Sequence, residues 1–159
     1  QKVDGYVKEA VAQGAKLACG GEIHAVPSCP KGSFYKPTIL TDVDNQMRCA
    51  QEEIFGPVLV VIKYNALDDA IEMANDSQYA LAASVWSENM KTLLYAAKKI
   101  DAGVIWLNEN MMAEIQAPYG GNKNSGLGRE YGTYGLMEYL KIKNNVLYTA
   151  KEYANFYDF

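Results

Sequence analysis

Short apolar segments alternate with amphipathic segments between residues 57 and 108, and this order constrains the fold more than any other feature. The first segment, PVLVVIKY, is apolar at consecutive positions, which is typical of a strand covered on both faces in a parallel sheet. Residues 67–74 and 90–100 repeat apolar residues at helical spacing. Residues 81–87 and 104–108 are short strand candidates. Strand–helix–strand–helix–strand order with short joints indicates right-handed crossovers. We therefore expect an α/β fold in three layers, with a largely parallel sheet and helices on both of its faces.

The flanking segments predict further elements. Apolar residues from Val3 to Val11 recur at helical spacing, and Gly14 follows them as a C-cap. We expect Asn65 and Ser87 to cap the two helices of the alternation. Residues 15–21 read as a short strand, residues 22–35 as a loop, and residues 134–139 as a helix.

Composition and charge restrict the class of protein. A chain of 159 residues is long enough for one domain with its own core, and its share of hydrophobic residues, 49%, is ordinary for a globular protein. A formal net charge of −4 argues against a nucleic-acid partner, because phosphate binding requires a concentrated basic surface. The longest apolar runs, such as residues 58–62, are too short to cross a membrane, and we expect neither a membrane span nor a secretory leader.

The cysteine and histidine content argues against disulfides and against a metal site. Three cysteines cannot all pair, none lies in a C-x-x-C motif, and the chain has a single histidine, His24. We therefore expect no bound metal and three reduced thiols in a cytoplasmic protein.

The densest glycine cluster, APYGGNKNSGLGREYG at residues 117–132, does not match a phosphate-binding loop. A P-loop read from Gly121 meets Leu127 where lysine is required, and a dinucleotide fingerprint read from Gly126 meets Tyr131 where glycine is required. The remaining roles for these glycines are positive φ angles and close approach of the backbone to a neighbour. We expect a buried turn that passes beside a ligand and leads into a helix.

Three segments, in this order and spacing, resemble the C-terminal part of the aldehyde dehydrogenase superfamily: EEIFGPVLVV, NDSQYALAASVW and APYGGNKNSGLGREYGTYGLMEYLKIK. The resemblance covers about residues 2–143. It implies an enzyme that oxidises an aldehyde to a carboxylic acid through a cysteine thiohemiacetal, with NAD or NADP accepting the hydride. It also implies that the nucleophile, the general-base glutamate and the nucleotide-binding domain lie upstream. None of the three cysteines here, including Cys49, has the Gly-Gln-x-Cys setting of that nucleophile, so the isolated chain is expected to be inactive.

The resemblance assigns cofactor contacts to the EEIFGPV segment. In the family the second glutamate, here Glu53, accepts hydrogen bonds from the nicotinamide-ribose hydroxyls, and the phenylalanine, here Phe55, packs beside the nicotinamide. A carboxylate suits a vicinal diol because it only accepts hydrogen bonds, and charge-assisted bonds are the stronger kind. The residues alone also allow a solvated helix end at Glu52 and Glu53 and ordinary core packing for Phe55. With the flanking matches we favour the cofactor role for Glu53 and Phe55 and a structural role for Glu52.

The resemblance places substrate and proton-transfer residues further along the chain. Tyr119 matches an aromatic residue of the family's substrate tunnel, although simple core packing is an alternative. Met111 and Ala113 fall in the variable stretch that lines the substrate, and Ala113 replaces an aromatic residue found in some members. Glu130 resembles a carboxylate that some members use to relay protons, and it could instead pair structurally, as we expect of Arg129.

Domain organisation and partners also follow from the resemblance. Residues 1–140 would be part of the catalytic domain, and residues 141–159 would form a C-terminal oligomerisation strand, from about residue 143 to 148, and a tail. An exposed strand edge needs a partner, so we expect a homodimer or homotetramer of the full-length protein. The alternative is a non-catalytic homologue or interaction module with the same fold, which an upstream Gly-Gln-x-Cys segment would exclude.

Overall fold

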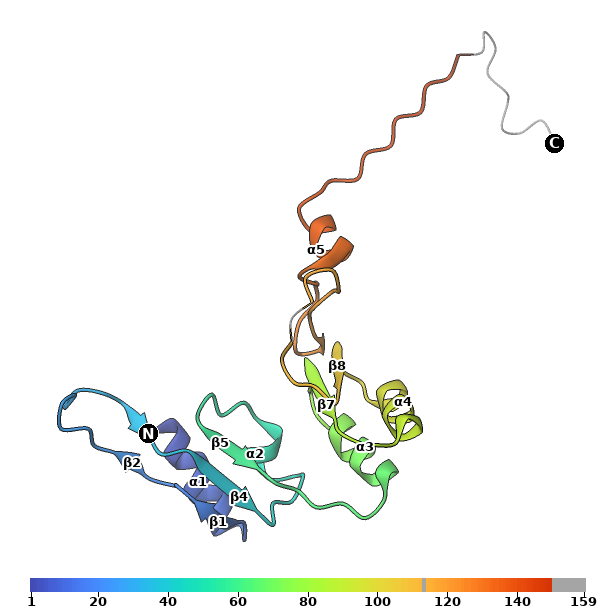
Figure 1. Cartoon of the computed structure of the whole chain (residues 1–159). Helices are drawn as coiled ribbons and strands as arrows, with labels where there is room; N and C mark the ends of the chain where they lie inside the picture. The colour runs from blue at the N-terminus through green and yellow to red at the C-terminus, as the bar shows by residue number, and fades with distance from the viewer. Residues whose placement is uncertain (113, 150–159) are drawn as a thin grey trace.

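A computed structural model describes residues 1–112 and 114–149 of the chain (Figure 1). Its first part is a three-stranded sheet in the order β1-β4-β5, in which β1 is antiparallel and β5 parallel to the central strand. The strands are β1 (Lys16–Cys19), β4 (Thr38–Thr41) and β5 (Val58–Val60), and the helices beside them are α1 (Lys2–Ala12) and α2 (Arg48–Gln51). The core joins α1, α2 and β4 around Leu40, whose exposed fraction is 0%, and includes Tyr6, Val7 and Cys49.

Two short strands interrupt the segment that was predicted as a loop. They are β2 (Ile23–His24) and β3 (Phe34–Tyr35), which pair antiparallel. Most of residues 22–35 is irregular, as expected, and Figure 1 shows this segment reaching out beyond the three-stranded sheet.

The predicted strand–helix–strand crossover is confirmed in the second part of the chain. Strands β7 (Ala82–Val85) and β8 (Val104–Leu107) pair in parallel, in the register Ala82↔Val104 to Val85↔Leu107, and α4 (Met90–Lys99) connects them. The remaining elements are α3 (Leu67–Asn75), β6 (Tyr79–Ala80), β9 (Asn122–Lys123) and α5 (Gly132–Met137). Strand β6 pairs antiparallel with β9, which brings the glycine-rich segment next to the crossover.

The α/β class is confirmed, and the pairing refines it. Parallel pairs join β4 to β5 and β7 to β8, whereas the other pairs are antiparallel and the described strands are divided among four small sheets. The prediction that residues 57–64 are covered on both faces is wrong for this chain. Val58 and Val60 pack against the core, but the side chain of Leu59 points the other way and is 59% exposed. Strand β5 lies at a sheet edge, and only one of its faces contacts the core.

The helix starts differ by one or two residues from those predicted. Helix α3 is capped at Ala66, whose backbone N–H donates to Asp69 Oδ2 over 3.1 Å, rather than at Asn65. Helix α4 is capped by Asn89, whose Oδ1 accepts a 2.9 Å hydrogen bond from the Lys91 backbone N–H. The predicted cap, Ser87, lies two residues earlier, and its Oγ accepts from the Asn89 backbone N–H. The local sequence predicted both helices but not the residue at which each helix begins.

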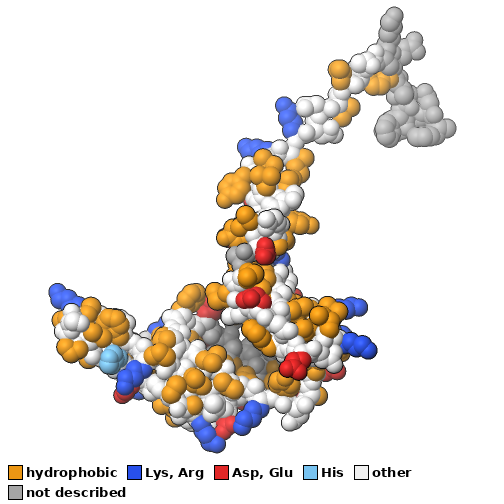
Figure 2. Space-filling view, viewed as in Figure 1, with side chains coloured by type: hydrophobic (Ala, Val, Ile, Leu, Met, Phe, Trp, Pro, Cys, Tyr) orange, Lys and Arg blue, Asp and Glu red, His pale blue; other side chains and the backbone are white. Residues whose placement is uncertain are grey.

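The predicted strand near residues 143–148 is not formed among the described residues, where this segment carries no strand pairing. A strand requires a neighbour for its backbone groups, and Figure 1 shows this segment running away from the rest of the chain. Apolar side chains line α5 and the residues around it (Figure 2), and Ile142, Val146 and Leu147 are 87%, 85% and 85% exposed. The aromatic tail lies outside the described residues. Within them, no helix combines the length and the apolar character that a membrane span requires.

Candidate functional site

The segment Glu52–Glu53–Ile54–Phe55 follows α2 and begins with extended backbone at Glu52, where φ is −113° and ψ is 155°. Ile54 is buried, with an exposed fraction of 9%, whereas Glu53 is exposed and Phe55 is 86% exposed. Phe55 has a φ of 50°, a left-handed conformation that is uncommon for a residue other than glycine. The alternative of ordinary core packing for Phe55 is therefore wrong, and an exposed aromatic ring stands close in sequence to the exposed side chain of Glu53.

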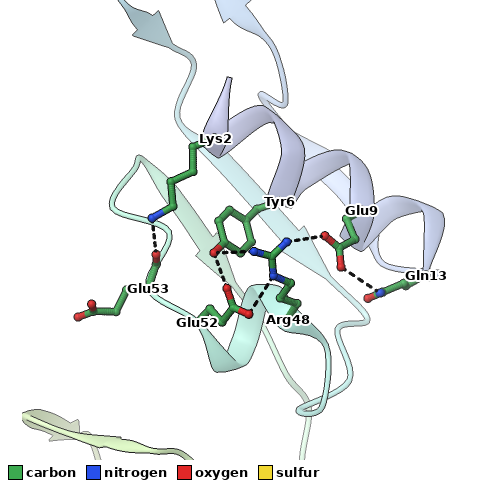
Figure 3. Close-up of polar contacts among 7 residues, drawn as sticks. All are labelled: Lys2, Tyr6, Glu9, Gln13, Arg48, Glu52 and Glu53. Atoms are coloured by element: carbon green, nitrogen blue, oxygen red, sulfur yellow. Dashed lines mark hydrogen bonds and ion pairs between the residues drawn. The ribbon is translucent and has the colours of Figure 1, made fainter. Parts of the chain in front are cut away.

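Glu52 is the member of the acidic pair whose carboxylate is held by protein partners, while its side chain remains 40% exposed (Figure 3). Its Oε1 accepts a 2.9 Å hydrogen bond from Arg48 Nε, and its Oε2 accepts a 2.6 Å hydrogen bond from the Tyr6 hydroxyl. The bond from Arg48, and then the bond from Tyr6, lowers the pKa of the Glu52 carboxyl below its ordinary value. The same contact with Glu52 raises the pKa of the Tyr6 phenol. The structural role expected for Glu52 agrees with this geometry.

Arg48 links the acidic segment to α1. Its guanidinium lies 4.5 Å from the centre of the Tyr6 ring, and a second nitrogen pairs with Glu9 Oε2 at 3.1 Å. Hydrogen bonds to Glu52, and then to Glu9, raise the pKa of Arg48 further above its usual value. The arginine thus remains charged and holds two carboxylates from separate helical segments.

The Glu53 side chain points away from this cluster (Figure 3). Its backbone carbonyl accepts a 3.3 Å hydrogen bond from Lys2 Nζ, while its carboxylate is exposed. The two neighbouring acids are therefore divided in role: one carboxylate is held by Arg48 and Tyr6, and the other is presented outward beside Phe55. An outward carboxylate next to an aromatic face can accept hydrogen bonds from a diol and contact a planar ring at the same time.

The glycine-rich segment forms a turn, but the prediction that this turn is buried is wrong, because Leu127 is 100% exposed. Tyr119 and Glu130 exchange backbone hydrogen bonds of 2.8 and 2.7 Å, which close the segment on itself. Arg129 donates from inside this turn to the carbonyl of Gly121 over 2.8 Å and to Asn122 Oδ1. The structural pairing predicted for Arg129 is thus confirmed by its contacts.

The predicted close approach of backbones is observed at Gly103, where a Cβ atom would lie 1.7 Å from the carbonyl oxygen of Gly120. Positive φ angles occur at Gly126 (143°) and Gly132 (57°), as the glycine cluster indicated. The glycine-rich turn therefore packs against the residues before β8 through Gly103 and Gly120, and a side chain at Gly103 would clash with the backbone of Gly120.

A cavity of about 180 Å³ lies at the end of β8, against the turn. Trp106, Met111, Tyr119, Glu130 and Tyr131 line it. Three residues predicted for the substrate or for proton transfer, Met111, Tyr119 and Glu130, thus lie together, while Ala113 is outside the described residues. Glu53 and Phe55 do not line this cavity.

Two lining residues of the cavity, Trp106 and Tyr131, were not predicted from the sequence. Trp106 comes from the strand VIWLN, and its indole N–H donates to the carbonyl of Met112 over 2.9 Å, which ties the end of the strand to the following loop. Tyr131 has a φ of 60° at the start of α5. An aromatic residue within a short apolar strand gave no signal that distinguished it from core.

The cysteines carry no sign of a catalytic thiolate. Cys49 is buried with an exposed fraction of 6%, and this burial raises the pKa of its thiol, which opposes formation of the nucleophilic thiolate. Cys19 and Cys29 are exposed. Residues 1–112 and 114–149 contain no group of three or more His, Cys, Asp and Glu side chains placed to hold a metal ion.

The pairing and the crossover define a chain of the α/β class, and comparison with known proteins identifies its family. A sequence model of the "Aldehyde dehydrogenase family" matches residues 1–145, and the chain belongs to this family.

The relatives support the same assignment by sequence and by structure. An aldehyde dehydrogenase of Enchytraeus buchholzi is 44% identical over 143 residues, which are 90% of this chain and 28% of that protein. The NAD-dependent aldehyde dehydrogenase of Sinorhizobium meliloti is 40% identical, with a TM-score of 0.89 over 98% of this chain and 30% of that one. A NAD+ complex of an aldehyde dehydrogenase from Bacillus cereus is 44% identical, with a TM-score of 0.83 over 89% of this chain and 28% of that one. The chain therefore spans less than a third of the length of these relatives.

Proposed function

We propose that this chain is the C-terminal part of an NAD-dependent aldehyde dehydrogenase that oxidises an aldehyde to a carboxylic acid. The observation that carries the proposal is the division of the acidic pair, which leaves the Glu53 carboxylate and the Phe55 ring exposed side by side. The match over residues 1–145 and the NAD+ complex of the Bacillus cereus relative support it.

Glu53 and Phe55 fit the nicotinamide half of the cofactor. A carboxylate accepts both hydrogen bonds of a ribose diol, and an exposed ring offers an apolar face to the nicotinamide. When bound, the nicotinamide supplies the hydride acceptor for aldehyde oxidation. Glu53 would hold the sugar, and hence fix the distance between the ring and the substrate, where small displacements cost rate. NADP remains an alternative cofactor, because no contact with the adenosine ribose is assigned to this chain.

The cavity at the end of β8 fits the substrate side. Tyr119 and Met111 provide an aromatic and a thioether surface for the aldehyde chain. Glu130 is exposed at the same cavity and can accept and release a proton there. Attack on the carbonyl and formation of the thiohemiacetal would require a cysteine outside this chain, since Cys49 is buried and neither Cys19 nor Cys29 lines the cavity. The isolated chain is accordingly proposed to be inactive.

The cell compartment and the oligomeric state belong to the same proposal. We infer a cytoplasmic homodimer or homotetramer of the full-length protein, supported by free rather than paired cysteines and by the exposed apolar side chains of Ile142, Val146 and Leu147.

The test is NADH formation by the full-length protein with NAD+ and a panel of short-chain, aromatic and cationic aldehydes. We expect turnover of at least one aldehyde by the full-length protein and none by the isolated chain. Turnover by the isolated chain would overturn its assignment as a part of the enzyme. A full-length protein that binds NAD+ but oxidises no aldehyde would favour the non-catalytic homologue.

A further inference from the structure

We propose that Tyr6 and Arg48 are positioning residues for the cofactor site, and that they act by holding Glu52 so that Glu53 and Phe55 point outward. This inference rests on the proposed function, because it assigns a purpose to the Glu52 carboxylate. It concerns Tyr6 on α1 and Arg48 on α2, which both contact Glu52.

The segment is held by protein contacts at alternate positions, and these contacts restrict the backbone around Glu53 and before Phe55. Glu52 is fixed by Arg48 and Tyr6, and Ile54 is fixed by burial in the core. Glu53 and Phe55 are the two residues that this leaves facing outward.

Helix α1 supplies further contacts along the same segment. Lys2 Nζ donates to the carbonyl of Glu53, and Val3 lies so close to Gly56 that a Cβ atom there would be 2.5 Å from Val3 Cγ2. Tyr6 donates to Glu52 from the next turn of the helix. Three residues on one helix thus contact the start, middle and end of the segment.

The conformation of Phe55 shows why such support is needed. A left-handed φ of 50° at a residue with a side chain persists only when its surroundings determine it. The Phe55 ring is 86% exposed and cannot hold itself in place. The contacts at Glu52, Ile54 and Gly56 are therefore the ones that fix its backbone.

A double-mutant cycle tests this inference in the full-length protein. The variants are Tyr6→Phe, Glu53→Gln and the two combined, and the readouts are the single-turnover rate of NADH formation, the affinity for NAD+ and Tm. Tyr6→Phe removes only the hydroxyl bound to Glu52 and keeps the ring under Arg48. The matched control is Tyr95→Phe. It removes the hydroxyl of a tyrosine on α4 that donates a 2.7 Å hydrogen bond to Asp68 on α3.

We expect Glu53→Gln to slow single turnover about 10- to 100-fold, the effect of losing hydrogen bonds to a charged acceptor. Tyr6→Phe should slow it roughly three- to tenfold, because a small displacement of the ribose contact costs rate. In the Glu53→Gln background Tyr6→Phe should have little further effect, since the carboxylate it orients is gone. Arg48→Lys keeps the charge but loses the planar guanidinium, and it should behave like Tyr6→Phe.

The outcomes separate the two claims. If Glu53→Gln leaves rate and affinity unchanged, the ribose contact itself is wrong. Suppose that Glu53→Gln lowers the single-turnover rate. If Tyr6→Phe then lowers the rate of the native protein and of Glu53→Gln by the same factor, or lowers neither, the positioning role alone is overturned. Equal effects of Tyr6→Phe and Tyr95→Phe on the single-turnover rate would also overturn the positioning role, because the Tyr6–Glu52 hydrogen bond would then contribute only to the stability of the fold.

Discussion

The hydroxyl of Tyr6 donates a 2.6 Å hydrogen bond to Glu52 Oε2, across 46 residues of sequence. Through this bond the first helix of the chain contacts the acidic segment that precedes β5. This bond and the one from Arg48 distinguish the two adjacent glutamates: the Glu52 carboxylate is bound by protein partners, and the Glu53 side chain points away from them.

The stability of the protein should depend on the charge of Glu52. Its folded-state pKa is lowered, so its contribution is fully present above the unfolded value of about 4.3 and is lost as the pH falls through the folded value. Glu52→Gln should therefore lower Tm at about pH 7, and the difference from the native protein should shrink towards about pH 3. Thermal unfolding across this range measures it, with the exposed Glu88→Gln as control. A Tm difference that is constant down to low pH would contradict the assignment.

Gly103→Ala should be strongly destabilising. The added methyl group would meet the carbonyl oxygen of Gly120 at 1.7 Å, and backbone on both sides leaves little room to relax. We expect a loss of about 3 kcal/mol, near the upper end for overpacking, measured by urea unfolding. Gly5→Ala is the matched control, because nothing lies within 4 Å of a Cβ atom there and alanine should stabilise α1 by about 1 kcal/mol. Similar stability of the two variants would show that Gly103 and Gly120 do not approach closely.

The three cysteines should differ in reactivity. Burial raises the pKa of Cys49, and its thiol is covered, whereas Cys19 and Cys29 are exposed. Iodoacetamide followed by peptide mass spectrometry should modify Cys19 and Cys29 first in the native protein, and all three at similar rates in urea. Fast modification of native Cys49 would mean that this thiol is accessible and would reopen its exclusion as a nucleophile.

The indole of Trp106 should affect the aldehyde more than the cofactor. Its N–H holds the carbonyl of Met112, next to the cavity that Met111 and Tyr119 line. Trp106→Phe should raise the KM for the aldehyde about three- to tenfold, the effect of one lost hydrogen bond, and leave the KM for NAD+ unchanged. Trp86→Phe serves as control, because Trp86 is 66% exposed and does not line this cavity. Equal changes in both KM values would remove Trp106 from the substrate side.

Much of the fold could be predicted from local patterns. Apolar residues recur at helical spacing in α1, α3 and α4, and short apolar segments mark β7 and β8. Each of these elements buries one side, and this leaves a pattern in the sequence. Caps were less predictable: Asn65 was expected where Ala66 precedes α3, and Ser87 was expected where Asn89 caps α4, because the backbone at each turn decides where the helix begins. The exposure of Leu59 depends on which strand lies beside β5, and that is a property of the topology.

The candidate site could be predicted only in part. The resemblance pointed to Glu53 and Phe55, yet the contact that divides Glu52 from Glu53 comes from Tyr6, and no local pattern links positions so distant. The same holds for the cavity, where Trp106 from β8 meets Tyr131 from the glycine-rich segment. These relationships arise from tertiary packing and have no signature within one element.

A crystal structure of the full-length protein with NAD+ tests the central claim most directly, through the distance from the Glu53 carboxylate to the nicotinamide-ribose hydroxyls. We predict hydrogen bonds of about 2.5–2.8 Å from the sugar to Glu53, with the Phe55 ring against the nicotinamide. A Glu53 carboxylate that faces solvent while the ribose is held by other residues would contradict the account.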